Sequence, residues 1–150
     1  MSARAAARLA TLGFTDVYRY QAGKADWFAA GLPREGAEAH VPRVADVAER
    51  DVPTCKLHER VGDLRERVRA AGRDVCVVVD AGRVVLGIVD AEALAGDSAT
   101  MVESIMKPAP VTFRPHLRTG EIPDYARKRQ ARHIFVTTSD GVLVGLLPDA

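Results

Sequence analysis

The chain has 150 residues, of which 47% are apolar and 27% charged, a composition typical of a globular protein rather than a disordered one. Its 21 basic and 20 acidic residues leave a net charge of +1, too weak a field to attract a nucleic acid or an anionic membrane, so we expect neither as a partner. The length suits one compact domain with a short appendage and excludes a large multidomain enzyme.

The opening segment, residues 1–36, has a mixed pattern. Residues 3–12 favour a helix by composition, residues 16–20 favour a strand, and residues 24–30 return to a helical pattern. An α-β-α piece of about thirty residues buries too little surface to fold alone. We therefore expect it to pack on the rest of the chain or on a partner, with Trp27 as its anchor.

A linker and a helix come next. Residues 37–43 are polar and carry Pro42, as expected of a linker. Apolar side chains then recur at helical spacing over residues 59–71, and Gly72 follows as a stop signal. The pattern predicts an amphipathic helix there.

Two apolar runs, residues 75–79 and 84–89, follow this helix and are separated by the turn at 80–83. Short apolar runs joined by a turn that contains Asp and Gly predict a β-hairpin. Residues 91–99 are rich in alanine, glycine, aspartate and serine, so we expect a connector with a short helix at its start.

The same order of elements then returns. A weaker helix is predicted from about Gly120, with Pro123 early in it, where a missing N–H costs nothing. A second hairpin is predicted from the apolar runs at 134–137 and 142–147, joined by Ser-Asp-Gly at 139–141.

The two halves align with each other at a shift of 58 residues without a gap. The aligned pairs include Val44 with Val102, Thr54 with Thr112, His58 with His116, Arg69 with Arg127, Val84 with Val142 and Gly87 with Gly145. We therefore predict an α/β (α+β) fold of two β-α-β-β units, at 44–99 and 100–150, in a pseudo-twofold pair. Each hairpin is apolar at most positions, so it should be covered by its own helix on one face and by the sister unit on the other.

The two cysteines, Cys55 and Cys76, have neither C-x-x-C spacing nor the density of a secreted disulfide framework. We interpret both as reduced thiols. No run of residues has the length and apolarity of a membrane span or signal peptide, so we expect a cytoplasmic location.

The repeated unit resembles a tandem pair of CBS domains, also called a Bateman module. The resemblance rests on Met-x-Pro-x-Pro-Val-Thr at Met106 to Thr112 and on the β-turn-β-Gly-apolar-apolar endings at Gly87 and Gly145. It covers about two thirds of the chain. It implies a non-catalytic regulatory module, often a homodimer, that binds an adenosine-containing nucleotide such as AMP or ATP between its two copies.

The family's nucleotide marker is Gly-apolar-apolar-Thr/Ser-x-x-Asp/Asn, and neither copy keeps it. In the first copy Asp90 replaces the hydroxyl residue and Ala93 replaces the ribose-binding acid, and a carboxylate there would repel a nearby phosphate. The second copy reads Gly-Leu-Leu-Pro-Asp-Ala from Gly145 to Ala150, with Pro148 at the hydroxyl position.

Five residues are candidate ligand contacts on this resemblance: Thr54, Asp90, Thr112, Arg132 and His133. The last two belong to a basic cluster at 127–133, which is either an anion clamp or a solvated helix end whose cations complement the helix dipole. The paired His58 and His116 are interpreted as turn residues, because no metal-ligating set surrounds them, and we predict no metal site. A dimerising or docking scaffold without ligand is the alternative function.

The opening segment, residues 1–36, resembles the carboxyl-terminal end of a rhodanese domain, which implies that the chain begins just past that family's catalytic cysteine loop. A remnant of a sulfurtransferase is therefore a further alternative. Cys55, five residues before Arg60, has the spacing of such a loop, but it follows the rhodanese-like segment and lacks the loop's context, so we predict no catalytic residue and no enzyme activity.

Overall fold

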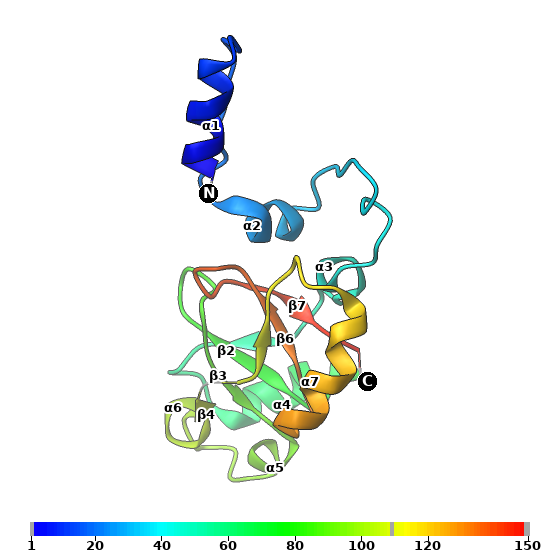
Figure 1. Cartoon of the computed structure of the whole chain (residues 1–150). Coiled ribbons are helices and arrows are strands. Elements are labelled where there is room, and N and C mark those ends of the chain that lie inside the picture. Colours follow the sequence, from blue (N-terminus) through cyan, green and yellow to red (C-terminus); the bar gives the residue numbers. More distant parts are fainter. Residues whose placement is uncertain (1, 109, 149–150) are drawn as a thin grey trace.

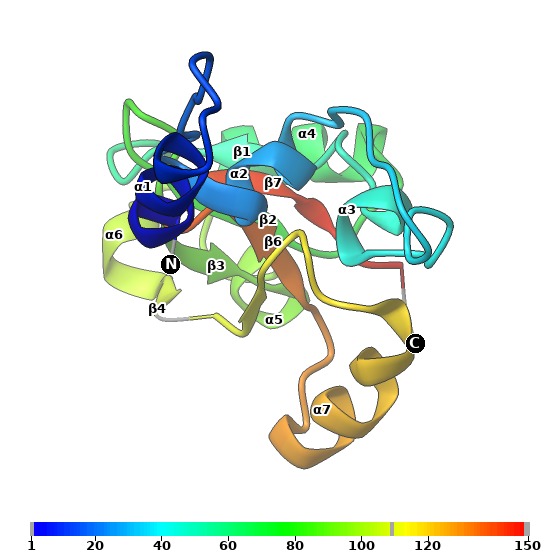
Figure 2. The same cartoon turned by 45° about the horizontal axis from the view of Figure 1, so that its top comes forward.

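The computed structural model describes residues 2–108 and 110–148. Two small β-sheets lie at the centre, with helix α4 (Val61–Ala70) on one outer side and helix α7 (Ile122–Arg129) on the other (Figures 1 and 2). A short 3-10 turn, Thr119–Glu121, leads into α7. Both helices lie where the apolar spacing predicts them.

The first sheet has the order β1-β2-β3-β4, and the second has the order β5-β6-β7. In each sheet the first two strands are parallel and the next pair is the predicted antiparallel hairpin. The strands are β1 (Thr54–Cys55), β2 (Cys76–Val79), β3 (Val85–Val89), β4 (Lys107–Pro108), β5 (Thr112–Phe113), β6 (Phe135–Thr137) and β7 (Leu143–Leu146). The repeated β-α-β-β order confirms the predicted fold class.

Side-chain alternation along β2 divides the core. Val77 and Val79 face the second sheet, where they join a cluster that contains Phe135, whereas Cys76 and Val78 face α4. All of these side chains are buried. The hairpin is therefore covered on both faces, as its continuous apolar run predicts.

The pseudo-twofold relation extends to individual hydrogen bonds. Val84 and Val142, which are equivalent under the 58-residue shift, form a β-bridge with each other. On either side of it, the Val85 N–H donates to the Gly141 carbonyl at 3.0 Å, and the Leu143 N–H donates to the Arg83 carbonyl at 2.9 Å. The two hairpin turns thus hold each other across the axis.

The copies also exchange their leading segments. Helix α3 (Val44–Val47) packs on the second sheet, and the Glu49 and Leu146 backbones exchange hydrogen bonds of 2.8 and 2.9 Å. Helix α6 (Val102–Ile105) packs on the core of the first copy, and β4 pairs with β3. Each copy therefore completes the sheet of the other, a feature that the repeat alone did not predict.

A glycine permits each exchanged segment to approach. A Cβ at Gly145 would lie 2.5 Å from the Glu49 carbonyl oxygen, and one at Gly87 would lie 2.7 Å from the Lys107 carbonyl oxygen. Both distances are below any real Cβ contact, and the obstructing atoms are backbone. The repeated glycines are thus required by packing.

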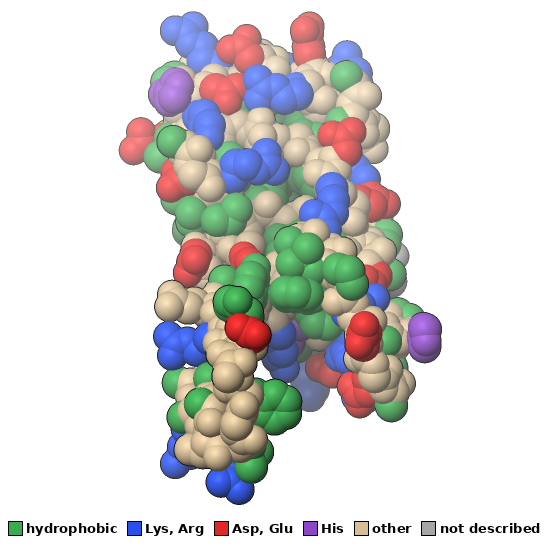
Figure 3. Space-filling view, turned by 90° about the horizontal axis from the view of Figure 1, so that it is seen from above, with side chains coloured by type: hydrophobic (Ala, Val, Ile, Leu, Met, Phe, Trp, Pro, Cys, Tyr) green, Lys and Arg blue, Asp and Glu red, His purple; other side chains and the backbone are tan. Residues whose placement is uncertain are grey.

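The amino-terminal arm comprises α1 (Ser2–Thr11), an extended stretch and α2 (Gly23–Ala29), and α1 stands away from the sheets (Figure 1). The predicted strand at 16–20 is wrong: these residues form no strand, because no neighbouring strand is there to pair with their backbone. Acidic and basic side chains are intermixed on the face that carries the arm (Figure 3).

Helix α2 attaches the arm to the body, but Trp27 is not the main anchor. The Trp27 indole donates to the Pro33 carbonyl at 2.9 Å and packs edge-on against Tyr20, both in its own segment. Ala29 instead packs against the core of the second copy, and Phe28 lies under the guanidinium of Arg43 at 5.7 Å. The Trp27 indole therefore stabilises the arm itself, because the residues it contacts belong to the same segment.

We predict that Gly145→Ala and Gly87→Ala each destabilise the protein by about 1–3 kcal/mol, because a new methyl group would push apart two hydrogen-bonded backbones. Urea unfolding measures the change. Gly120→Ala is the matched control, since nothing lies within 4 Å of its added Cβ and its φ is not positive. Equal stability of all three variants would show that the close approach is not needed.

Candidate functional site

A cleft of about 380 Å³ lies between the two copies. The first copy contributes the end of β3 and the start of helix α5 (Ala91–Leu94), and the second contributes the segment before β5 and the loop from α7 to β6. The lining residues are Ile88, Asp90, Ala91, Glu92, Pro110, Val111, Arg129, Gln130, Ala131, Arg132 and His133. Three of the five predicted contacts, Asp90, Arg132 and His133, therefore meet in one place.

Asp90 lines the cleft, but both of its carboxylate oxygens already have partners. Oδ1 accepts from the Ala93 N–H at 3.2 Å and caps α5, while Oδ2 accepts from Lys107 Nζ at 2.5 Å. The Lys107 ammonium holds the pKa of the Asp90 carboxyl below its ordinary value. Asp90 thus stays ionised and partly neutralised, which lessens the phosphate repulsion expected of an isolated carboxylate.

Arg132 and His133 enter the cleft from the second copy and reach across to the first. Arg132 Nη2 donates to Asp74 Oδ2 at 2.6 Å, and His133 Nε2 lies 3.6 Å from Asp74 Oδ1. The His133 side chain is 9% exposed, whereas that of Arg132 is 75% exposed. His133 is therefore buried in the cleft wall, whereas the Arg132 guanidinium is exposed to solvent while it is paired with Asp74.

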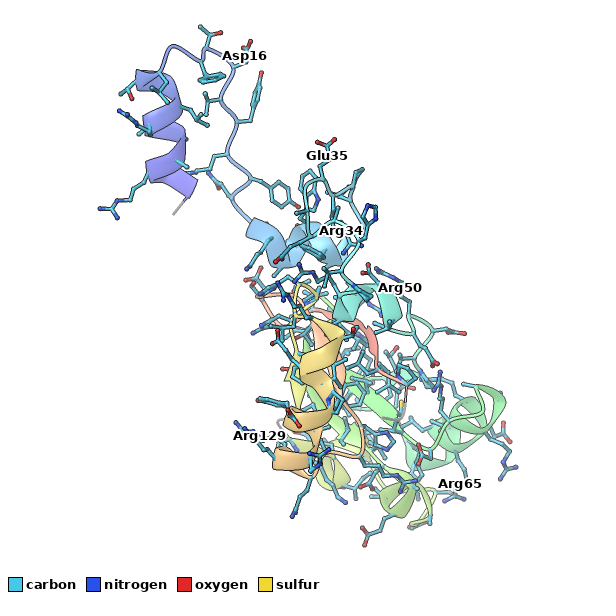
Figure 4. The ribbon with its side chains drawn as sticks, turned by 45° about the vertical axis from the view of Figure 1, so that its right-hand side comes forward. Asp16, Arg34, Glu35, Arg50, Arg65 and Arg129 are labelled. Atoms are coloured by element: carbon cyan, nitrogen blue, oxygen red, sulfur yellow. The ribbon has the colours of Figure 1, made fainter. Side chains whose placement is uncertain are left out.

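The cleft is electrically polar. The first copy lines it with the carboxylates of Asp90 and Glu92, which pair with Lys107, and the second copy lines it with the guanidinium groups of Arg129 and Arg132. Figure 4 shows Arg129 at the outer end of α7. Carboxylates accept hydrogen bonds from hydroxyl groups, and guanidinium groups donate to phosphate. The lining thus offers acceptors for hydroxyl groups from the first copy and donors for an anion from the second.

Thr112 lies in an adjoining cavity of about 350 Å³ that shares Pro110 with the cleft. Its charged neighbour Arg114 donates to the Thr137 hydroxyl at 2.9 Å and to the Thr138 carbonyl. In the first copy Lys56, the counterpart of Arg114, donates to the Asp80 carbonyl at the equivalent turn. The 58-residue shift pairs these cations, a signal that the sequence interpretation missed.

Thr54 lies apart from the other candidates. It belongs to β1, and its carbonyl accepts from Arg67 Nη1 at 2.7 Å. Among the described residues it is not part of the cleft lining. Neither Thr54 nor its repeat partner Thr112 therefore lines the cleft with Asp90.

The equivalent cleft on the other side of the axis is smaller, at about 320 Å³, and differs in charge. It is lined by Gly72, Arg73, Asp74, His133, Leu146 and Leu147. Arg73 forms an ion pair with Glu49, and Asp74 is paired with Arg132. The end of the second marker, Asp149 and Ala150, lies outside the described residues. Arg73, the arginine that lines this cleft, is therefore already matched by a carboxylate.

Cys55 does not resemble a sulfur-transfer nucleophile. It is 2% exposed and lies in β1, facing the core beside Cys76, and both thiols are free. The hydrogen bond with Cys55, together with burial, raises the pKa of Cys76. Neither sulfur has the exposed, electropositive surroundings of a reactive thiolate.

His116, one of the paired histidines, is partly buried among basic side chains. Burial, followed by the charges of Lys24, Arg43 and Arg114, lowers the pKa of its imidazole. Within residues 2–108 and 110–148 no group of three His, Cys, Asp or Glu side chains could hold a metal ion. In the same residues, no helix is long and apolar enough to span a bilayer.

Comparison with known proteins identifies the architecture. Residues 44–96 match the family model of the CBS domain. No curated protein matches the sequence.

Among solved structures, a CBS domain pair/ACT domain protein from Thermotoga maritima is similar, with a TM-score of 0.60 and 18% identity over 71% of this chain and 88% of that one. The cytosolic domain of the Mg²⁺ channel MgtE in complex with ATP gives 0.64 and 20%, over 70% of this chain and 45% of that one. CBSX2 in complex with AMP gives 0.62 and 19%, over 70% and 88%. The fold of the repeat is thus that of a CBS domain pair.

We predict that Lys107→Met raises the pKa of Asp90 toward its ordinary value of about 3.9, because the ammonium that favours the carboxylate is gone. The folded pKa of Asp90 is lowered, so its contribution to stability is complete above the unfolded pKa and is lost as pH falls through the folded one. Lys107→Met should therefore reduce the loss of stability that protonation of Asp90 causes at low pH. A ¹³C NMR titration of the Asp90 carboxyl gives the pKa directly, with Lys128→Met on α7 as the control. An unchanged Asp90 titration in Lys107→Met would show that the pair does not persist in solution.

Proposed function

From the fold of a CBS domain pair, we propose that the cleft between Asp90 and Arg132 binds an adenosine-containing nucleotide and that the protein is a non-catalytic regulatory module. The observation that carries this proposal is the meeting of Asp90, Arg132 and His133, contributed by both copies, in one polar cleft. The complexes of MgtE with ATP and of CBSX2 with AMP have the same fold and support this class of ligand.

The charges of the cleft give the ligand an orientation. The ribose hydroxyls donate to Asp90 and Glu92, and the phosphate accepts from Arg132 and Arg129. The volume of about 380 Å³ lies at the small end of the range for ligand sites and favours a mononucleotide over a triphosphate. A ligand that touches both copies stabilises their association, which is how occupancy would reach a partner protein.

The competing function is a dimerising or docking scaffold that binds no nucleotide. It is supported by the loss of the family marker in both copies and by the internal partners that Asp90 and Arg132 already have. We propose a homodimer in the cytoplasm for either function.

Isothermal titration with AMP, ATP and S-adenosylmethionine distinguishes these functions, and saturable binding should be accompanied by a rise in melting temperature. We predict that Arg132→Ala weakens AMP binding about tenfold, through loss of a charge-assisted hydrogen bond. Arg127→Ala is the matched control, since it removes one positive charge from the same helix end but does not line the cleft. Absence of saturable binding to all three ligands would favour the scaffold.

We keep one alternative from a different class, in which residues 1–36 are part of a rhodanese-type sulfurtransferase. Only the resemblance of the opening segment supports it. We predict that the chain catalyses no thiosulfate-to-cyanide sulfur transfer that depends on Cys55, because that thiol is buried in the core. Comparison of wild type with Cys55→Ser in this assay tests the point, and turnover lost in the variant would contradict it.

A further inference from the structure

The cavity of about 350 Å³ that contains Thr112 lies beside the turn between β6 and β7 and adjoins the cleft between the copies. We call it the turn cavity. The turns of the two hairpins lie side by side (Figure 1), so both copies contribute to it. Val85 comes from the first copy, and the polar lining of the second comprises Thr112, Arg114, Thr137, Ser139 and Asp140.

Two opposite charges line the turn cavity without an ion pair. Arg114 is half-buried, and its hydrogen bonds all run from Nη1 to neutral oxygens of residues 137 and 138. Asp140 is exposed. Within residues 2–108 and 110–148, neither Arg114 nor Asp140 pairs with an oppositely charged side chain. Neutral acceptors compensate a guanidinium for lost water less well than a carboxylate does, so an anion from outside would stabilise Arg114.

The first copy has the same turn without the polar lining. Under the 58-residue shift, Thr137, Ser139 and Asp140 correspond to Val79, Ala81 and Gly82. Both hairpins nonetheless have the same irregularity of register before the turn. In each, a cation also donates to a turn carbonyl, from Lys56 or from Arg114. The additional polar side chains of the second copy are therefore not needed to form the turn.

Asp140 is not the cap of its turn either. In the first copy Asp80 Oδ1 accepts from the Val84 N–H at 2.8 Å. In the second copy the Thr138 hydroxyl takes this position and accepts from the Val142 N–H at 3.1 Å. The carboxylate of Asp140 thus has no role in the hydrogen bonds of the turn that would account for its presence.

The charges of the lining select the class of ligand. A simple anion would be attracted by Arg114 but repelled by Asp140, and the reverse holds for a simple cation. A zwitterion matches both groups at once. Because the lining has one cation and one carboxylate, a ligand with a further charged group would be matched less well.

We propose that the turn cavity binds a neutral, zwitterionic α-amino acid. The ligand carboxylate accepts from Nε and Nη2 of Arg114, which are not used in its contacts with the turn, and the ligand ammonium donates to Asp140. The hydroxyls of Thr112 and Ser139 can donate to or accept from the remaining polar atoms. The proposal is independent of nucleotide binding, because Asp90, Arg132 and His133 do not line this cavity.

The test begins with the full chain and a set of neutral L-amino acids. At about 10 mM, at least one of them should raise the melting temperature, and isothermal titration should show that it binds saturably. The N-acetyl derivative of that amino acid lacks the ammonium, and its α-amide lacks the carboxylate. Each derivative should bind at least about tenfold more weakly, since each loses one charge-assisted pair.

Variants assign the two charges. Asp140→Asn should weaken binding of the amino acid at least about tenfold but should not weaken binding of the N-acetyl derivative, which has no ammonium. Arg114→Lys retains the charge and can donate to the turn as Lys56 does, but it loses the bidentate pair and should weaken binding about tenfold. Glu103→Gln on the exposed face of α6 is the matched control and should bind like wild type. Asp140→Gly, the residue of the first copy, replaces Asp140→Asn if the latter does not fold.

Four results would overturn the proposal. The first is no saturable binding of any of the amino acids at about 10 mM, and the second is equal affinity for wild type and the folded Asp140 variant. The third is inorganic phosphate binding more tightly than the amino acid, because the cavity would then be a simple anion site. The fourth is loss of amino-acid binding in Arg132→Ala, which would place the ligand in the cleft between the copies. Loss of AMP binding alone in that variant concerns only the nucleotide proposal.

Discussion

The structure depends on a reciprocal backbone exchange between two equivalent units. The segment that precedes each unit pairs with the last strand of the other, at Glu49 with Leu146 and at Lys107 with Ile88. This pairing needs a residue without a side chain at positions 87 and 145, where the carbonyls of the incoming segments come closer than a Cβ would allow. Because the exchange is mutual, neither unit has a complete sheet without the other. The shared core and the cleft between the copies both follow from this exchange.

The exchange also explains the chemistry of the cleft. Segment exchange places Lys107, which belongs to the second repeat, beside Asp90 of the first, so the carboxylate that replaces the family's hydroxyl residue is matched by a local cation. The symmetry-related position is Glu49, which pairs with Arg73 and leaves no corresponding cation for a ligand. Two sites that are equivalent by topology are therefore unequal in charge. One cleft is lined by Arg129 and Arg132, and the other by Arg73.

The copies differ further on their outer faces. In the first, α5 is capped by Asp90 and held by Arg65, and its leucine completes the core. In the second, prolines stand at both supporting positions, and the equivalent apolar side chains line a groove. The two copies thus share the apolar positions but differ in the residues at the two polar supports.

The sequence by itself determined the two long helices and the two hairpins of the repeat, and the equivalence of its halves. Helices α4 and α7 and the two hairpins follow from local periodicity and turn chemistry, which depend only on neighbouring residues. The segment at 16–20 was misjudged for the opposite reason: its residues favour a strand, but a strand also needs a partner that lies elsewhere in the chain. Tertiary structure alone decided the segment exchange, the Lys107–Asp90 pair and the separation of Thr54 and Thr112 from Asp90. These features join residues that are distant in sequence across a pseudo-twofold axis. The 58-residue period shows that the unit repeats, but it does not specify which sheet each leading segment pairs with.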